Sequence, residues 1–185
     1  MRNDIKKILL TEQEIASICK SMGKQLTNDY KGTKLVVIGL LKGCNPFMAD
    51  LVRQIDLPLE IYYMSVSSYH GGIKSSGDVQ IKMDLDISIA NRDVLLVEDI
   101  VDTGNTIVTI MDFLKHRGAK SIKLATLLDK PEGRLRECTP NYIGKTIPKE
   151  FVVGYGLDYD EFYRNLPYVG VLKEEIYMKK GETNE

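Results

Sequence analysis

Residues 94–106 read Val94-Leu95-Leu96-Val97-Glu98-Asp99-Ile100-Val101-Asp102-Thr103-Gly104-Asn105-Thr106. The apolar start, Val94 to Val97, is typical of a strand buried on both faces of a parallel sheet. Residues 98–105 are predicted to form a polar turn, and the apolar stripe that follows has helical spacing and ends at Gly118. The stretch therefore predicts a strand, a turn and a helix, in that order.

The rest of the chain repeats this alternation. Helices are predicted from Thr11, where Glu14 gives capping-box spacing, to before Gly32, and over residues 47–55 after Pro46. Strands are predicted at 35–41, 59–66, 122–128 and 169–172. Alternating strands and helices indicate an α/β fold with a central parallel sheet flanked by helices. Ligands of such sheets bind at the carboxyl ends of the strands, here after Leu41, Val97 and Leu128.

Length and charge limit the class of protein. The chain has 185 residues, so we expect residues 1–185 to form a single domain. Its 25 basic and 26 acidic side chains give a formal net charge of −1, with no long basic block. A nucleic-acid partner is therefore not expected, although small anions remain candidate ligands.

Cysteine usage and the first residues predict the compartment. The three cysteines are widely spaced and form no CxxC pair, which argues against a disulfide framework or a thiolate zinc site. Met1 is followed by charged residues, and no apolar run reaches the ~18 residues of a membrane span. We expect no membrane association and a cytoplasmic location.

The turn after the strand at residue 94 has the composition of a ligand site. Backbone N–H groups and the positive end of the helix dipole could cradle a phosphate at residues 102–106. Glu98 and Asp99 would repel that phosphate, so they are better suited to sugar hydroxyls or a divalent cation. Helix capping by Asp99 and Asp102 is the simpler alternative, but a cap needs one acid. The turn predicts a site for a sugar phosphate with Mg²⁺.

All thirteen positions resemble the signature of the type I phosphoribosyltransferases: an apolar strand, two acids, two apolar residues and Asp-Thr-Gly-x-Thr. Three further segments resemble the hypoxanthine-guanine phosphoribosyltransferases: residues 41–43, Ser68-Tyr69, and Lys130 with residues 151–158. The resemblance implies the type I fold, with a small hood formed by terminal segments. It also implies that the sugar donor is 5-phosphoribosyl 1-pyrophosphate.

The resemblance assigns roles to the turn. Asp102 matches the general base, which handles the proton on the purine imidazole ring and stabilises the oxocarbenium-like centre. Glu98 and Asp99 match the residues that hold the ribose hydroxyls and Mg²⁺. The 5′-phosphate loop matches Thr103, Gly104, Asn105 and Thr106.

Other matched residues would hold the pyrophosphate. Lys42 and Gly43 match the pyrophosphate loop, in which the resemblance implies a cis peptide between Leu41 and Lys42. Arg164 matches an arginine that reaches the pyrophosphate, and Asp158 matches a ligand of a second Mg²⁺. From the residues alone, Lys42 could equally be a surface lysine, Arg164 a salt-bridge partner and Asp158 a turn residue.

The base would be selected at the other end of the site. Lys130 matches a lysine that donates to the purine O6, and a side chain with only donors disfavours the 6-amino group of adenine. Phe151 matches a residue that stacks on the purine, although it could instead be a core residue, and the backbone of Val152 would read the purine edge. Residues 67–78 resemble a lid that excludes water, with Ser68 and Tyr69 meeting the pyrophosphate.

These matches predict a transferase of purine salvage. It would convert hypoxanthine, and guanine, to IMP and GMP with release of pyrophosphate, and it would form a homodimer or homotetramer. Xanthine as the base remains an alternative, because all three bases carry O6. A donor-sensing regulator that binds RNA or DNA would need a basic surface or an added DNA-binding segment. A pyrophosphokinase would need an ATP site, and the chain has no Walker A motif.

Overall fold

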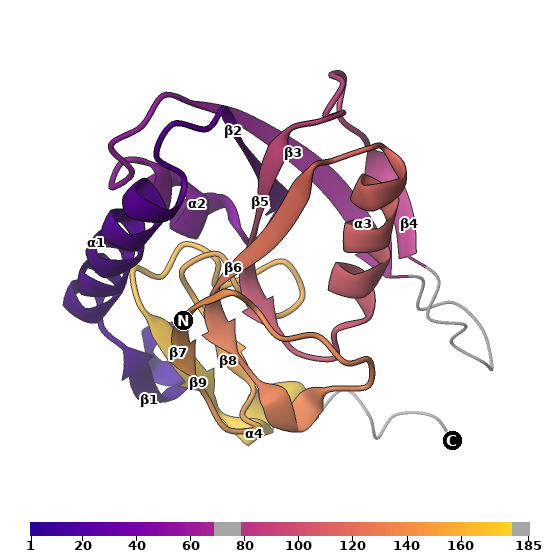
Figure 1. Cartoon of the computed structure of the whole chain (residues 1–185). Helices are drawn as coiled ribbons and strands as arrows, with labels where there is room; N and C mark the ends of the chain where they lie inside the picture. The colour runs from indigo at the N-terminus through magenta and orange to yellow at the C-terminus, as the bar shows by residue number, and fades with distance from the viewer. Residues whose placement is uncertain (69–78, 179–185) are drawn as a thin grey trace.

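The computed structural model of the chain describes residues 1–68 and 79–178. Within these residues, six strands form one sheet in the order β4-β3-β2-β5-β6-β7 (Figure 1). All neighbouring strands are parallel except β3 and β4, so the predicted α/β fold with a central, mostly parallel sheet is confirmed. The strands are β2 (Leu35–Leu41), β3 (Leu59–Ser68), β4 (Val79–Met83), β5 (Asp93–Val101), β6 (Ser121–Asp129) and β7 (Tyr142–Thr146).

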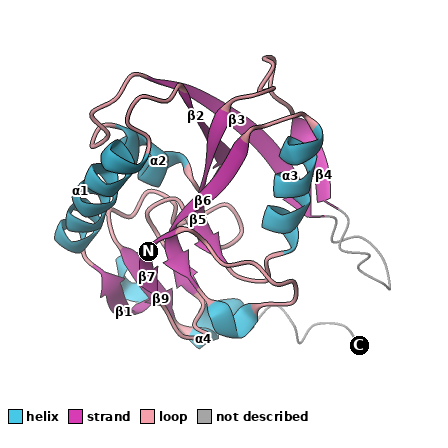
Figure 2. Ribbon diagram, viewed as in Figure 1, coloured by secondary structure: helices cyan, strands magenta, loops and turns pink. Residues whose placement is uncertain are grey.

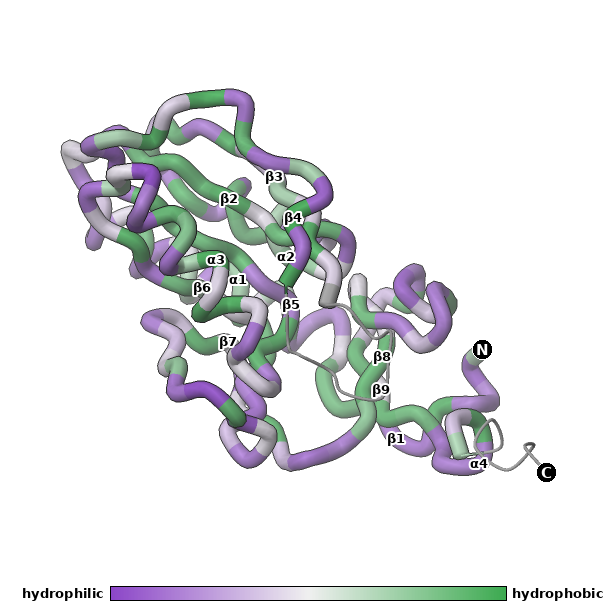
Figure 3. Tube along the Cα trace, turned by 90° about the vertical axis from the view of Figure 1, so that its right-hand side faces the viewer, coloured by the Kyte–Doolittle hydropathy of each residue, from purple (hydrophilic) through white to green (hydrophobic). Residues whose placement is uncertain are grey.

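Helices cover both faces of this sheet. Figure 2 shows α1 (Glu12–Asp29) and α2 (Asn45–Val52) on one side and α3 (Asn105–His116) on the other. Leu35 and Val37 of β2 pack in the cluster under α1 and α2, whereas Val36 and Ile38 pack in the cluster under α3. This alternation explains why β2 is an unbroken apolar run, which appears green along its length in Figure 3.

A second, antiparallel sheet forms the hood. Its strand order is β1-β9-β8, and it joins both ends of the described chain: β1 (Ile5–Leu10), β8 (Val152–Val153) and β9 (Val169–Leu172). Figure 3 shows it to one side of the main sheet, together with α4 (Glu174–Tyr177). The hood that the resemblance implied from terminal segments is therefore present. Two short 3₁₀ helices, η1 (Arg2–Asp4) and η2 (Pro131–Gly133), complete the described elements.

The helix predicted at Thr11 begins there. The Glu14 backbone N–H donates to Thr11 Oγ1 at 3.2 Å, and the Thr11 N–H donates to Glu14 Oε2 at 2.8 Å. Both halves of the capping box are present, as the spacing predicted. Among the described helices, none is long and apolar enough to cross a membrane.

Several element boundaries were predicted wrongly. The strand predicted over residues 59–66 continues to Ser68, because residues 67 and 68 still pair with β4. The polar turn was placed from Glu98, but β5 continues to Val101 because its pairing with β6 continues from Glu98↔Thr126 to Val101↔Asp129. Glu98 and Asp99 therefore project from a strand. The second helix ends at Val52 rather than Ile55, because the last N–H groups bond three residues back instead of four.

Candidate active site

Asp102 and Lys130 lie together at the carboxyl ends of β5 and β6. Val101 and Asp129 are register partners, and the Lys130 N–H donates to the Val101 carbonyl at 3.0 Å. The next side chains along the two strands are therefore neighbours, and Lys130 Nζ donates to Asp102 Oδ2 at 2.7 Å. The lysine is nearly buried, while the aspartate side chain is 42% exposed. A cationic donor thus lies beside an anionic acceptor, and the acceptor is open to solvent.

Arg134 fixes the backbone around the Asp102–Lys130 pair. Its guanidinium donates to the carbonyls of Val101 at 2.5 Å, Asp102 at 2.6 Å and Lys130 at 3.3 Å. It also forms an ion pair with the carboxylate of Asp129, in which both side chains are mostly buried. One side chain therefore fixes the backbone on both sides of the Asp102–Lys130 pair.

The segment between Asp102 and α3 leaves backbone donors free. Gly104 has φ = +82°, and α3 begins there without a side-chain cap. The first helical bond runs from the Val108 N–H to the Gly104 carbonyl, so the N–H groups of residues 105–107 have no partner inside the helix. The Asn105 N–H donates to Thr103 Oγ1 at 3.4 Å, which leaves those of Thr106 and Ile107 for a ligand. Together with the helix dipole, these donors suit an anion such as a phosphate.

A cavity of about 390 Å³ lies between the strand ends of the main sheet and residues 158–164. Gly43 lies against Asp99 there, and a Cβ on this glycine would fall 1.8 Å from the Asp99 carboxylate. The peptide between Leu41 and Lys42 is cis, as the resemblance implied. The lining residues are Leu40, Leu41, Lys42, Gly43, Ser65, Val66, Ser67, Lys82, Glu98, Asp99, Asp158, Glu161 and Arg164.

The two adjacent carboxyl groups in the cavity are poorly hydrated. Burial raises the pKa of Glu98 well above its ordinary value, and the charge of Asp99 raises it further. Burial also raises the pKa of Asp99, although the Ile100 N–H, which donates to it at 2.9 Å, opposes that shift. A divalent cation or hydroxyl donors placed between these carboxylates would stabilise their charged forms. Within the described residues, no group of three or more His, Cys, Asp or Glu side chains could hold a metal without a substrate.

The predicted cations of the cavity are already paired with acids. Lys42 forms an exposed ion pair with Glu161 at 2.9 Å. Arg164 bonds Asp158 at 2.8 Å and Glu161 at 3.4 Å and donates to the Gly156 carbonyl at 2.8 Å. Its buried Nε has no hydrogen-bond partner.

Of the residues predicted to bind the base, Lys130 follows β6 of the main sheet, whereas Phe151 and Val152 lie beside and in the hood, and none of the three lines the cavity. Phe151 is 39% exposed rather than a core residue, and its ring stacks on Tyr177 with centroids 4.8 Å apart. Val152 is buried in β8, where it pairs with Val171. Tyr69, most of the predicted lid and the side chain of Ser68 lie outside the described residues.

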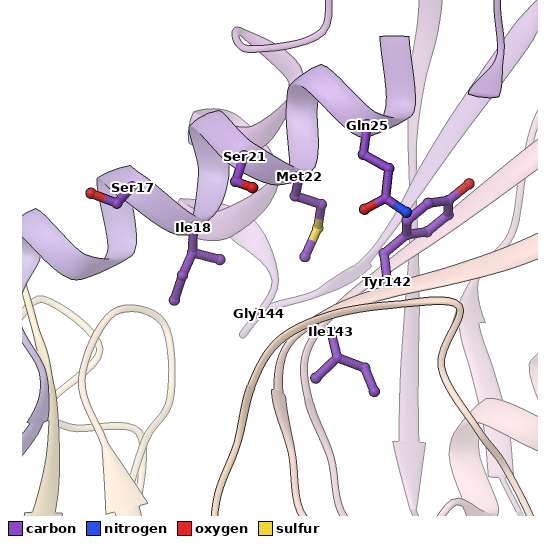
Figure 4. A pocket seen from close by; sticks show the side chains of 8 residues that line it. All are labelled: Ser17, Ile18, Ser21, Met22, Gln25, Tyr142, Ile143 and Gly144. Carbon is purple, nitrogen blue, oxygen red and sulfur yellow. The ribbon is translucent and has the colours of Figure 1, made fainter. Parts of the chain in front are cut away.

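Figure 4 shows a different cavity, of about 290 Å³, between α1 and β7. It is lined by Ser17, Ile18, Ser21, Met22, Gln25, Tyr142, Ile143 and Gly144, none of which is charged at neutral pH or predicted to bind substrate. The cavity at the strand ends, which contains seven charged side chains, is therefore the better candidate for an anionic substrate.

Sequence reasoning missed Lys82, Arg134 and Glu161. Lys82 lies on β4, a strand that was not predicted, and contributes to the cavity. Glu161 follows Asp160, and only its contacts with Lys42 and Arg164 show that it belongs to the site. The sequence offered one signal for Arg134: it lies four residues after Lys130, which was predicted to bind the base.

Comparison with known proteins identifies the family. The family model described as "Phosphoribosyl transferase domain" matches residues 6–160. The chain belongs to the phosphoribosyltransferase family. A curated hypoxanthine-guanine phosphoribosyltransferase of Staphylococcus aureus (strain Mu50 / ATCC 700699) is 55% identical over 177 residues, which cover 96% of this chain and 99% of that protein. The predicted family and enzyme class are therefore confirmed, since these relatives are pentosyltransferases.

Solved structures agree with this assignment. A crystal structure of a hypoxanthine phosphoribosyltransferase from Staphylococcus aureus superposes with a TM-score of 0.92 at 55% identity, covering 96% of each chain. A Trypanosoma cruzi hypoxanthine phosphoribosyl transferase, studied for the role of its C-terminal region in oligomeric state and enzymatic activity, gives a TM-score of 0.90 at 41% identity over 95% of each chain. This phosphoribosyltransferase thus shares its whole fold with these proteins.

Replacing Arg134 tests the anchoring of the site. Arg134→Gln leaves the mostly buried Asp129 carboxylate without its cation, so we expect the free energy of unfolding to fall by about 3 kcal/mol in urea denaturation. Arg136→Gln is the matched control, because the exposed guanidinium of Arg136 donates to Thr109 Oγ1 and pairs with no buried acid of the described residues, so the change in stability should be less than about 0.5 kcal/mol. Equal stability of the two variants would contradict the anchoring role.

Proposed function

We propose that this protein transfers the 5-phosphoribosyl group from 5-phosphoribosyl 1-pyrophosphate to hypoxanthine and guanine. The products are IMP or GMP and pyrophosphate, and the reaction serves purine salvage. The observation that carries this proposal is the 2.7 Å contact between Lys130 and Asp102 at the ends of adjacent strands. The names of the 55%-identical relatives support the same choice of bases.

The Asp102–Lys130 pair matches one edge of a 6-oxopurine. On that edge, O6 accepts hydrogen bonds and lies next to N7. A lysine can only donate, so Lys130 suits O6 and not the amino group of adenine. The Asp102 carboxylate can only accept, so it suits a proton on N7. A 6-oxopurine would therefore replace the contact between the two side chains with one contact to each.

The same pair supplies the proton chemistry. The N9 atom of the base forms a bond to the ribose anomeric carbon while the bond from that carbon to the pyrophosphate oxygen breaks. The proton on N7 passes to the Asp102 carboxylate, and the electron pair of the broken bond leaves with pyrophosphate. Lys130 donates to O6 and stabilises negative charge that develops on the purine.

The donor would lie along the strand ends. Residues 103–106 hold its 5′-phosphate with backbone N–H groups, and Thr103 and Thr106 add hydroxyls. Lys42, Gly43 and Arg164 hold the pyrophosphate. Glu98 and Asp99 would hold the ribose hydroxyls and one Mg²⁺, and Asp158 would hold a second Mg²⁺ at the pyrophosphate. When bound, Mg²⁺ offsets the negative charge of the leaving pyrophosphate. The Phe151 ring would stack on the purine with the ring face that points away from Tyr177.

We also propose how the chain is organised in the cell. Residues 1–185 act as one domain, which is supported by a core cluster that contains both β2 of the main sheet and β9 of the hood. A homodimer or homotetramer in the cytoplasm remains our proposal. The three free cysteines are compatible with that compartment.

A panel of bases tests the proposed function. Purified protein with Mg²⁺ and the donor is offered hypoxanthine, guanine, xanthine, adenine, uracil and orotate, and pyrophosphate release is followed. We expect turnover with hypoxanthine and guanine, and at least ~10³-fold lower kcat/KM with adenine, because its amino group meets the Lys130 donor. Efficient turnover of adenine or orotate, or no turnover of any base, would refute the proposal.

Asp102→Asn tests the proton acceptor. The amide keeps the shape of the side chain but cannot take up the proton, so we expect kcat to fall by about 10²- to 10⁴-fold. Donor affinity should change little. Asp112→Asn is a matched control on the exposed face of α3, where activity should be retained. If Asp102→Asn turns over at the wild-type rate, the proton must be accepted elsewhere.

Lys130→Gln tests the contact to O6. Loss of a charge-assisted hydrogen bond should raise the KM for hypoxanthine about tenfold or more, while the KM for the donor stays near its wild-type value. Lys20→Gln, on an exposed turn of α1, is the control. An unchanged KM for hypoxanthine would exclude Lys130 from base recognition.

A further inference from the structure

One cation of the substrate cavity has no assigned role. Lys82 of β4 lines the cavity beside Ser65 and Ser67 of β3. This part of the wall belongs to the main sheet. The wall on the hood side is formed by Asp158, Glu161 and Arg164. Lys82 therefore lines the cavity from a strand of the main sheet, whereas Arg164 lines it from the segment between β8 and β9.

An irregularity in the sheet places Lys82 there. Ser65 pairs with Met83, but the next residue, Val66, pairs with Ile81. Two steps along β4 thus correspond to one step along β3, and Lys82 is the extra residue of a β-bulge. Bulges next to active sites re-aim side chains, and here the re-aimed side chain is a lysine that lines the cavity.

The charges of the cavity single out the same residue. Lys42 is paired with Glu161, and Arg164 is paired with Asp158 and Glu161. Across residues 1–68 and 79–178, Lys82 makes no ion pair within 4 Å. Asp84, two residues along the chain, is engaged by Arg117 at 2.5 Å. Among the three cations that line the cavity, Lys82 is therefore the one that forms no ion pair with an acid of residues 1–68 or 79–178.

We propose that Lys82 binds the diphosphate group, both in the donor and in the pyrophosphate product. The inference rests on the proposed function, because it assigns Lys82 to the diphosphate group of that reaction's substrate and product. A lysine ammonium binds phosphate oxygens as a compact point charge with three donors. Because Lys82 lies on β4 and Arg164 lies in the segment between β8 and β9, a diphosphate bound by both would bridge the two walls of the cavity. Lys82 also offsets the four carboxylates of the lining, which would otherwise repel the diphosphate.

Lys82→Gln tests this assignment. With hypoxanthine as the base and Mg²⁺ present, we expect the KM for the donor to rise about tenfold, because one charge-assisted hydrogen bond is lost. The KM for hypoxanthine should stay within about twofold, since the base contacts Lys130 at the other end of the site. Calorimetric titration of the donor should show a similar loss of affinity. Lys82→Arg should keep most of the wild-type affinity, and Lys20→Gln should keep all of it.

The possible results separate the inference from the proposed function. If the wild-type protein forms no nucleotide from the donor and hypoxanthine, the proposed function fails. If the wild type is active and Lys82→Gln leaves the donor KM and Kd unchanged, the proposed role of Lys82 is wrong. An equal rise in both KM values, without selectivity for the donor, would also overturn it. Lys82 is exposed, so thermal unfolding should show that the variant keeps its fold.

Discussion

The site depends on the parallel register between β5 and β6. Pairing of Val101 with Asp129 brings the next residues of the two strands, Asp102 and Lys130, to the same edge of the sheet. A shift of one residue would turn each side chain to the opposite face and separate the pair. The register is itself fixed by burial, because residues 94–97 of β5 and 124–128 of β6 are fully enclosed. Hydrophobic packing on both faces of the sheet thus determines where the polar chemistry lies.

The two sheets contribute different residues to the proposed site. In the proposed reaction, the proton acceptor Asp102, the O6 donor Lys130 and the carboxylates Glu98 and Asp99 lie on or directly after strands of the main sheet. The hood and the segment that leads to it supply Phe151, Asp158 and Arg164. The cavity therefore lies where segments far apart in the sequence meet.

The sequence predicted the interior of the fold better than its edges. The buried strands β2, β5 and β6 were found because doubly buried strands are unbroken apolar runs. The strands β1, β4, β7 and β8 were missed: they are short and partly exposed or only two residues long, so they show no clear period. The turn was placed too early, because the polarity of Glu98 and Asp99 hid the continuation of β5. The motif named the residues of the site, but the Asp102–Lys130 contact, the bonds of Arg134 and the bulge at Lys82 depend on strand register, which no local pattern encodes.

A crystal structure with IMP and Mg²⁺ tests the central claim most directly. The account predicts that the purine O6 lies about 3 Å from Lys130 Nζ and N7 faces the Asp102 carboxylate, with the bond between the two side chains replaced. It also predicts that the 5′-phosphate accepts bonds from the backbone N–H groups of residues 103–106. A nucleotide whose phosphate lies away from that turn, or whose base leaves the Lys130–Asp102 bond intact, would contradict it.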